Sequence, residues 1–182
     1  MLSATTSGRA DVTTASEQLA AALEFYRQSE AIARTPGMVP SDDVGRVLAL
    51  LALHRGRLFN QHHNFARAAQ VLPEAVRHFQ PTAEGDNYAK ALYAIGQALL
   101  GLGDAHDAQQ RLDQALTLFK ADCSLRRQAE THAVLASAID DREGTVAHLR
   151  AAEEIYTKLG DARVDDIQRR LATMNVEDGN TR

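Results

Sequence analysis

One apolar pattern, Leu-x-x-Ala-x-x-x-Phe/Tyr, recurs along this sequence and constrains its fold more than any other feature. The spacing places its three apolar side chains on one face of an α-helix. The later copies follow one another at intervals of 40 and 37 residues. A repeat of that length is typical of stacked helical units, because one unit cannot bury its apolar face without its neighbours. The four copies occupy residues 19–26, 72–79, 112–119 and 149–156.

The rest of the chain shows the same helical periodicity, and no segment alternates as a strand would. Turn residues such as Gly103-Asp104 and Gly160-Asp161 separate the periodic segments. The sequence therefore predicts an all-α chain with one helical-repeat domain over residues 16–174. The ends, residues 1–15 and 175–182, lack periodicity and are predicted to be disordered tails. Helices are expected over residues 16–34, 41–59, 65–79, 88–102, 105–120, 125–139, 145–159 and 164–174.

Composition and charge narrow the class of protein. A length of 182 residues suits one domain, with 45% hydrophobic and 24% charged residues. The net charge of -4 argues against direct binding to nucleic acid, which favours a basic surplus. No window is apolar enough to cross a membrane, and nothing resembles a signal peptide. The single cysteine, Cys123, cannot form an internal disulfide, so we expect a cytoplasmic protein.

The positions of the small residues within each unit carry a family resemblance. Gly96 lies within one helix, the Gly103-Asp104 turn follows, and Ala108, Leu112 and Ala115 lie on the next; Gly56, Ala68 and Ala75 repeat the scheme. These residues resemble the tetratricopeptide repeat family. The period is longer than usual there, and the segment 155–161 is similar to a long-helix subtype found in large bacterial transcriptional regulators. The resemblance implies a right-handed superhelix of antiparallel helical hairpins. About three repeats would be flanked by an N-terminal helix and a C-terminal capping helix.

In that family, ligands lie in the concave groove made by the first helix of each hairpin. The resemblance therefore implies a partner-binding groove with one cation per hairpin: Arg57, Lys90 and Arg127. Such a row suits an acidic peptide or a chain-terminal carboxylate. The groove residues expected are Leu50, Leu53, His54, Arg57, Gln61, Lys90, Tyr93, Gln97, Arg127 and Glu130.

Two interpretations of the helix that begins at Ser41 stay open. Leu50, Leu53, His54 and Arg57 form a second stripe beside its core stripe. A helix that is apolar on two faces must cover something. Either the N-terminal helix packs over Leu50 and Leu53, or they form an apolar floor for a ligand.

The candidates for chemistry have simpler explanations as turn residues. His62-His63 and Asp140-Asp141 fall at turns, and Cys123 has no histidine held beside it by a motif. We therefore predict no enzyme, no metal and no cofactor. The function expected is a scaffold or regulatory module that binds a protein or peptide, and a homo-oligomer stays open. The alternative is a sensor domain that binds a small ligand or signalling peptide and modulates a transcriptional regulator.

Overall fold

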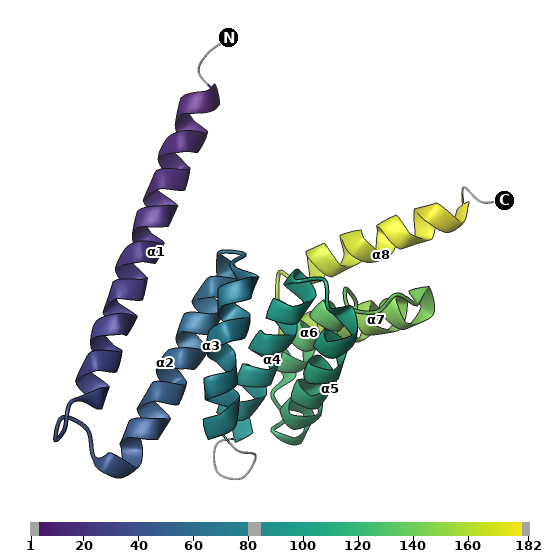
Figure 1. Cartoon of the computed structure of the whole chain (residues 1–182). Coiled ribbons are helices and arrows are strands. Elements are labelled where there is room, and N and C mark those ends of the chain that lie inside the picture. The colour runs from purple at the N-terminus through teal and green to yellow at the C-terminus, as the bar shows by residue number, and fades with distance from the viewer. Residues whose placement is uncertain (1–3, 80–84, 180–182) are drawn as a thin grey trace.

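The computed structural model describes residues 4–79 and 85–179, which form eight α-helices and no strand (Figure 1). The prediction of an all-α chain is confirmed. The helices are α1 (Ala4–Arg34), α2 (Ser41–Gln61), α3 (Phe65–His78), α4 (Gly85–Gly101), α5 (Ala105–Ala121), α6 (Leu125–Leu135), α7 (Arg142–Leu159) and α8 (Val164–Gly179).

Four short turns between consecutive helices share one backbone geometry. In each, an amide donates to the carbonyl five residues earlier, which closes the preceding helix. The residue before that amide adopts a left-handed conformation. Gly103 and Gly160 fill this position after α4 and α7, whereas His63 and Cys123 fill it after α2 and α5. The bonds run from Asn64 to Phe59 (2.8 Å), Asp104 to Leu99 (3.0 Å), Ser124 to Phe119 (2.9 Å) and Asp161 to Tyr156 (3.0 Å).

The repeated leucine packs on a repeated glycine. A Cβ atom at Gly56 would lie 2.4 Å from Cγ of Leu72, and one at Gly96 would lie 2.6 Å from Cγ of Leu112. Such contacts leave no space for a side chain, so α2 approaches α3 as closely as α4 approaches α5. The same pair of residue types thus fixes the same helix contact in two successive units.

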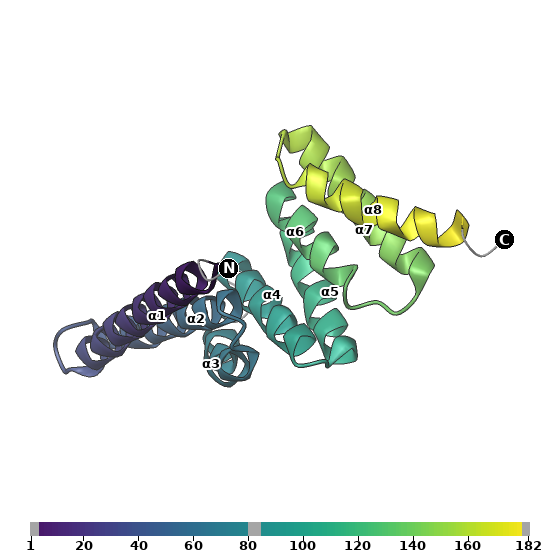
Figure 2. The same ribbon diagram turned by 90° about the horizontal axis from the view of Figure 1, so that it is seen from above.

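The core runs through the whole stack of helices. The pattern residues of α5 and α7 are no more than 2% exposed, as are Leu72, Ala75 and Phe79 at the end of α3. Buried residues form clusters that connect α2, α3 and α4, then α4, α5 and α6, then α6, α7 and α8. Seen from above, the helices follow one another from α1 at one end to α8 at the other (Figure 2).

The first helix packs less completely than the others. Its pattern residues Leu19, Ala22 and Tyr26 are only half-buried. Leu23 joins the core cluster of α2, α3 and α4, and Arg55 Nη1 of α2 donates to Glu30 Oε2 across 3.2 Å. Figure 1 shows the N-terminal part of α1 extending past the ends of α2 and α3.

The helix ends differ from the predictions by more than three residues at three places. The first helix begins at Ala4 and the last ends at Gly179, beyond the bounds of 16 and 174 that the periodicity predicts. No proline interrupts either extension, and adding residues to an existing helix is far easier than starting one. The sixth helix ends at Leu135 and not at residue 139, because residues 136–138 form a turn.

Candidate functional site

A cleft of about 660 Å³ lies where α2, α4 and α6 come together with α8. Three of these are the first helices of successive helix pairs. The lining residues are Arg57, Asn60, Gln61, His63, Phe65, Tyr93, Gln97, Leu100, Gly101, Arg127, Glu130, Ala133, Val134, Ser137 and Arg170. Segments more than a hundred residues apart in the sequence therefore contribute to one site.

Six of the ten predicted groove residues line this cleft. They are Arg57 and Gln61 from α2, Tyr93 and Gln97 from α4, and Arg127 and Glu130 from α6. The structure therefore brings predicted residues from all three first helices together.

Leu50 and Leu53 do not line the cleft, which corrects the prediction. Leu53 is 1% exposed and belongs to the core of α2, α3 and α4, and Leu50 packs against that core. Leu23 of α1 packs against the same cluster. The two leucines of the stripe contribute to the core because neighbouring helices cover them, as a helix with two apolar faces requires.

His54 and Lys90 also lie outside the cleft lining, although Arg57 and Lys90 both act on His54 through their charges. Burial lowers the pKa of His54, and the positive charges of Arg57 and Lys90 lower it further. Lys90 forms an ion pair with Asp86 one turn earlier in α4. In the predicted row of one cation per hairpin, the charge of Lys90 is therefore compensated within its own helix.

On the α6 wall, Glu130 is held between two arginines. Arg127 Nη1 donates to Glu130 Oε2 across 2.9 Å, and Arg163 Nη1 donates to Glu130 Oε1 across 2.7 Å. Arg163 also forms two hydrogen bonds with Asp161 and lies over the ring of Tyr156, 4.7 Å from its centroid. The contacts of Arg163 fix Glu130 in place, so Arg127 is oriented at the cleft surface.

On the α4 wall, Tyr93 presents a neutral phenol. Gln97 Nε2 donates to Tyr93 Oη across 3.1 Å. Burial raises the pKa of Tyr93, and the negative charge of Glu130 raises it further. The phenol therefore keeps its proton at neutral pH, and its O–H group is a donor for an acceptor on a ligand.

Asn60 joins the floor of the cleft to α4. Its Nδ2 donates to the carbonyl of Ala94 across 2.8 Å. Its Oδ1 is buried and has no hydrogen-bond partner among the described residues. A buried amide oxygen without a donor is unfavourable, so this residue contributes a polar group that the protein itself leaves unpaired.

The cleft also contains residues that the prediction of groove positions missed. His63 and Phe65 come from the α2–α3 turn and the start of α3, with ring centroids 5.7 Å apart in an edge-on arrangement. Arg170 comes from α8, where its guanidinium donates to the carbonyl of Ala133 (3.0 Å) and to Ser137 Oγ (2.9 Å). Sequence spacing gave no signal for Arg170, because its role depends on how α8 lies against α6.

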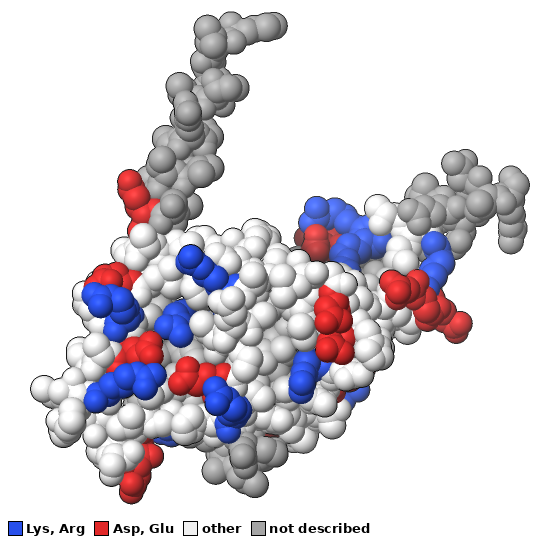
Figure 3. Space-filling view, viewed as in Figure 1, with Lys and Arg blue, Asp and Glu red and all other residues white. Residues whose placement is uncertain are grey.

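The charges of the lining leave a positive surplus. The lining contains three arginines, Arg57, Arg127 and Arg170, and one carboxylate, Glu130. Arg57 is half-buried and forms no hydrogen bond or ion pair with any described residue. A half-buried guanidinium without a partner favours an anionic ligand. Elsewhere on the molecule, in the view of Figure 3, basic and acidic side chains lie interspersed.

Other kinds of site receive no support from the described residues. No three or more His, Cys, Asp or Glu side chains gather there as a metal site would require. None of the described helices combines the length and apolar character of a membrane span. In comparisons with known proteins, the chain matches no family model, no curated protein and no solved structure.

Proposed function

We propose that this chain is a non-catalytic binding module, related to the long-helix tetratricopeptide repeats, that holds a segment of a partner protein in its cleft. The proposal includes a right-handed superhelix of antiparallel helical hairpins, with α2, α4 and α6 on the concave side. The observation that carries it is the cleft itself, which takes its walls from the first helix of each successive pair. A cytoplasmic location is part of the same proposal and is supported by a single, unpaired cysteine.

The lining residues suit the binding of an extended peptide better than they suit catalysis. Side-chain amides from Asn60, Gln61 and Gln97 offer both donors and acceptors to a peptide backbone. Tyr93 and Phe65 add aromatic surface against which an apolar side chain can pack. Binding groups of these kinds, spread over several helices, are what a peptide of a few residues requires.

The charge of the cleft indicates an acidic peptide. Arg57 has no hydrogen-bond or ion-pair partner among the described residues, and the O–H of Tyr93 is available to an acceptor. Arg127 is held at the surface through Glu130. We therefore expect a carboxylate of the peptide to bind Arg57.

Selection from a random peptide library on the intact chain tests this function. We expect the selected peptides to be rich in Asp and Glu next to an apolar residue, and to lose affinity when Arg57 is replaced by Ala. Selected peptides without acidic residues would contradict the predicted ligand class. Peptides whose binding is unchanged in both Arg57→Ala and Tyr93→Ala would place the site elsewhere.

The volume of the cleft supports a second function, the binding of a small anionic ligand by a sensor domain. About 660 Å³ lies within the range of small-molecule sites, roughly 300–1,000 Å³. A panel of small carboxylates and phosphates, tested by thermal shift, separates the two functions. A rise in melting temperature with a small anion, together with a failed peptide selection, would favour the sensor.

A further inference from the structure

Two histidines bridge α6 and α7 behind the cleft. Nδ1 of His132 lies 2.9 Å from Nδ1 of His148, and the ring centroids are 5.0 Å apart. Both side chains are half-buried. At this distance the two nitrogens share one hydrogen bond, in which one imidazole donates and the other accepts.

The number of protons on the pair decides whether this bond exists. Two neutral rings, or one neutral and one protonated ring, can form an N–H···N bond. When both rings are protonated, each Nδ1 carries a hydrogen and each ring is a cation. Two cations at 2.9 Å repel each other, and neither nitrogen can then accept. Acid therefore converts a contact that joins α6 to α7 into one that separates them.

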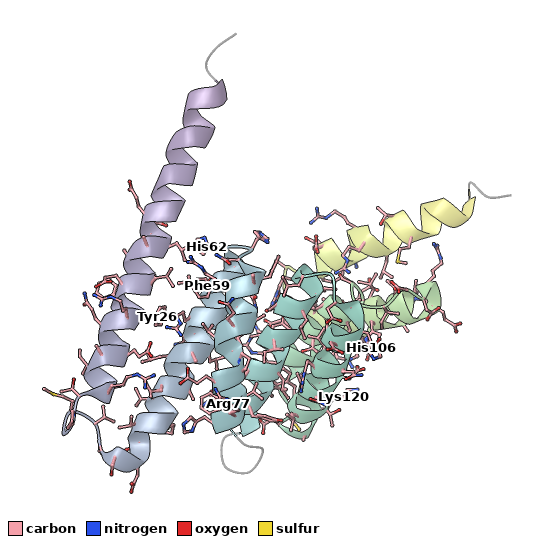
Figure 4. The ribbon with its side chains drawn as sticks, in the orientation of Figure 1. Tyr26, Phe59, His62, Arg77, His106 and Lys120 are labelled. Carbon is pink, nitrogen blue, oxygen red and sulfur yellow. The ribbon has the colours of Figure 1, made fainter. Side chains whose placement is uncertain are left out.

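The surroundings of the pair favour the neutral rings. Burial is the main cause that lowers the pKa of His132, to about 4, and the charges of His148 and Lys120 lower it further. Burial and Lys120 also lower the pKa of His148, whereas Asp113 raises it. Asp113 and Lys120 both belong to α5, and Figure 4 marks Lys120 on that helix. Because the two rings are in contact, they titrate as a pair.

One member of the pair, His132, belongs to α6, which forms one wall of the cleft. His132 lies between Glu130 and Ala133, and α6 also carries Arg127 and Val134 at the cleft surface. We propose that the His132–His148 pair makes this wall acid-sensitive, so that α6 loosens from α7 and the cleft loses its ligand as the pH falls from 7 to 5. The loosening of α6 stands on the pair alone, whereas the loss of ligand rests on the proposed function.

Stability falls with decreasing pH because the unfolded chain binds protons more readily than the folded pair does. A histidine in the unfolded chain has a pKa near 6.5, so it binds a proton before the folded pair does. Stability is therefore greatest above that value and falls as the pH decreases toward 4. The pKa values of the carboxylates Glu30 and Asp161 are lowered from ordinary values that are already acidic, so these groups contribute little between pH 7 and 5. The pKa of His54 is also lowered, but this residue lies on α2, away from the α6–α7 contact.

Asparagine is the suitable replacement, because it places an amide at the position of Nδ1 and does not titrate. The test compares the parent chain with the double variant His132→Asn/His148→Asn by hydrogen exchange at pH 7 and pH 5, corrected for the intrinsic rate. In the parent, we expect the protection of α6 and α7 to fall about tenfold more than that of α3, in keeping with one extra proton bound on opening. In the double variant, we expect this excess to vanish. His106→Asn, an exposed histidine on α5 marked in Figure 4, is the control and should behave like the parent.

Equal pH dependence in the parent and the double variant would overturn the proposal. If the double variant does not fold, His148→Asn alone removes the second cation and should lower the excess clearly. The ligand step is measured with a selected acidic peptide, whose affinity should fall between pH 7 and 5 in the parent more than in the variant. Loosening of α6 without any peptide binding would refute the proposed function and leave the acid sensitivity intact. Peptide binding together with an α6 that does not loosen in acid would refute the acid sensitivity and leave the proposed function intact.

Discussion

Leu112 of α5 packs directly on Gly96 of α4, so closely that a Cβ atom at Gly96 would lie 2.6 Å from the leucine Cγ. Leu72 and Gly56 repeat this contact in the preceding pair of helices. The glycine has no other evident role within its helix, where it costs about 0.5–1 kcal/mol relative to alanine. Close approach of the two helices is therefore the reason for its presence.

Replacement of Gly96 by Ala should destabilise the protein, because the new methyl group forces the Leu112 side chain or the helix to move. Overpacking of this kind costs about 1–3 kcal/mol in free energy of unfolding. Urea denaturation followed by circular dichroism measures the change. Gly85→Ala in the same helix is the matched control, since a Cβ there meets nothing within 4 Å. Equal stability of the two variants would show that the Gly96–Leu112 contact is wrong.

Replacement of Cys123 by Gly should stabilise the folded protein. Its φ of 54° lies in the left-handed region, where a side chain crowds the backbone and glycine does not. Gly103 and Gly160 occupy the equivalent turn position with φ of 87° and 60°. We expect Cys123→Gly to raise the free energy of unfolding by about 0.5–1 kcal/mol and Gly103→Ala to lower it by about 1 kcal/mol. A destabilised Cys123→Gly variant would mean that the thiol makes a contact that outweighs the strain.

Arg170 should fasten α8 to the end of α6. Its guanidinium bonds to Ala133 and Ser137, so Arg170→Ala removes two hydrogen bonds between the helices. The expected cost is about 1–2 kcal/mol, since part of the group is solvated. The neighbouring Arg169 pairs only within α8, with Asp166, and is largely exposed. Arg169→Ala should therefore change stability by less than about 0.5 kcal/mol. Hydrogen exchange of α8 that is equally fast in both variants would contradict this assignment.

The elements that could be predicted from sequence are those that packing determines. Gly56, Gly96 and the Leu-Ala-Phe/Tyr pattern bury the same face in each unit, so spacing alone located the helices and most of the core. The cleft was predicted only where the repeat register dictates it, at residues such as Arg57, Tyr93 and Arg127. The positions of those residues follow from the repeat alone and do not depend on how distant helices pack together.

The errors arise where a second partner decides the role of a residue. Leu53 lies on a helix with two apolar faces, and its sequence does not say which face a neighbour covers. Lys90 has an acidic residue one turn before it, and this spacing is a local signal for the ion pair with Asp86. Arg170 and the His132–His148 pair depend on contacts between helices far apart in sequence. No local spacing encodes contacts of that kind.

The affinity of a selected acidic peptide for charge variants of the cleft tests the central claim most directly. The comparison is between the parent, Arg57→Ala, the triple variant Arg57→Ala/Lys90→Ala/Arg127→Ala and the control Arg126→Ala, with helicity checked in each. Arg126 is adjacent to Arg127, is 64% exposed and pairs with Asp161 outside the cleft lining, so its loss should leave affinity nearly unchanged. We expect Arg57→Ala to cost about 2–5 kcal/mol if the peptide carboxylate is desolvated there, and the triple variant to abolish binding. Equal affinity of the parent and the triple variant at physiological salt would contradict the assignment of the cleft as the binding site.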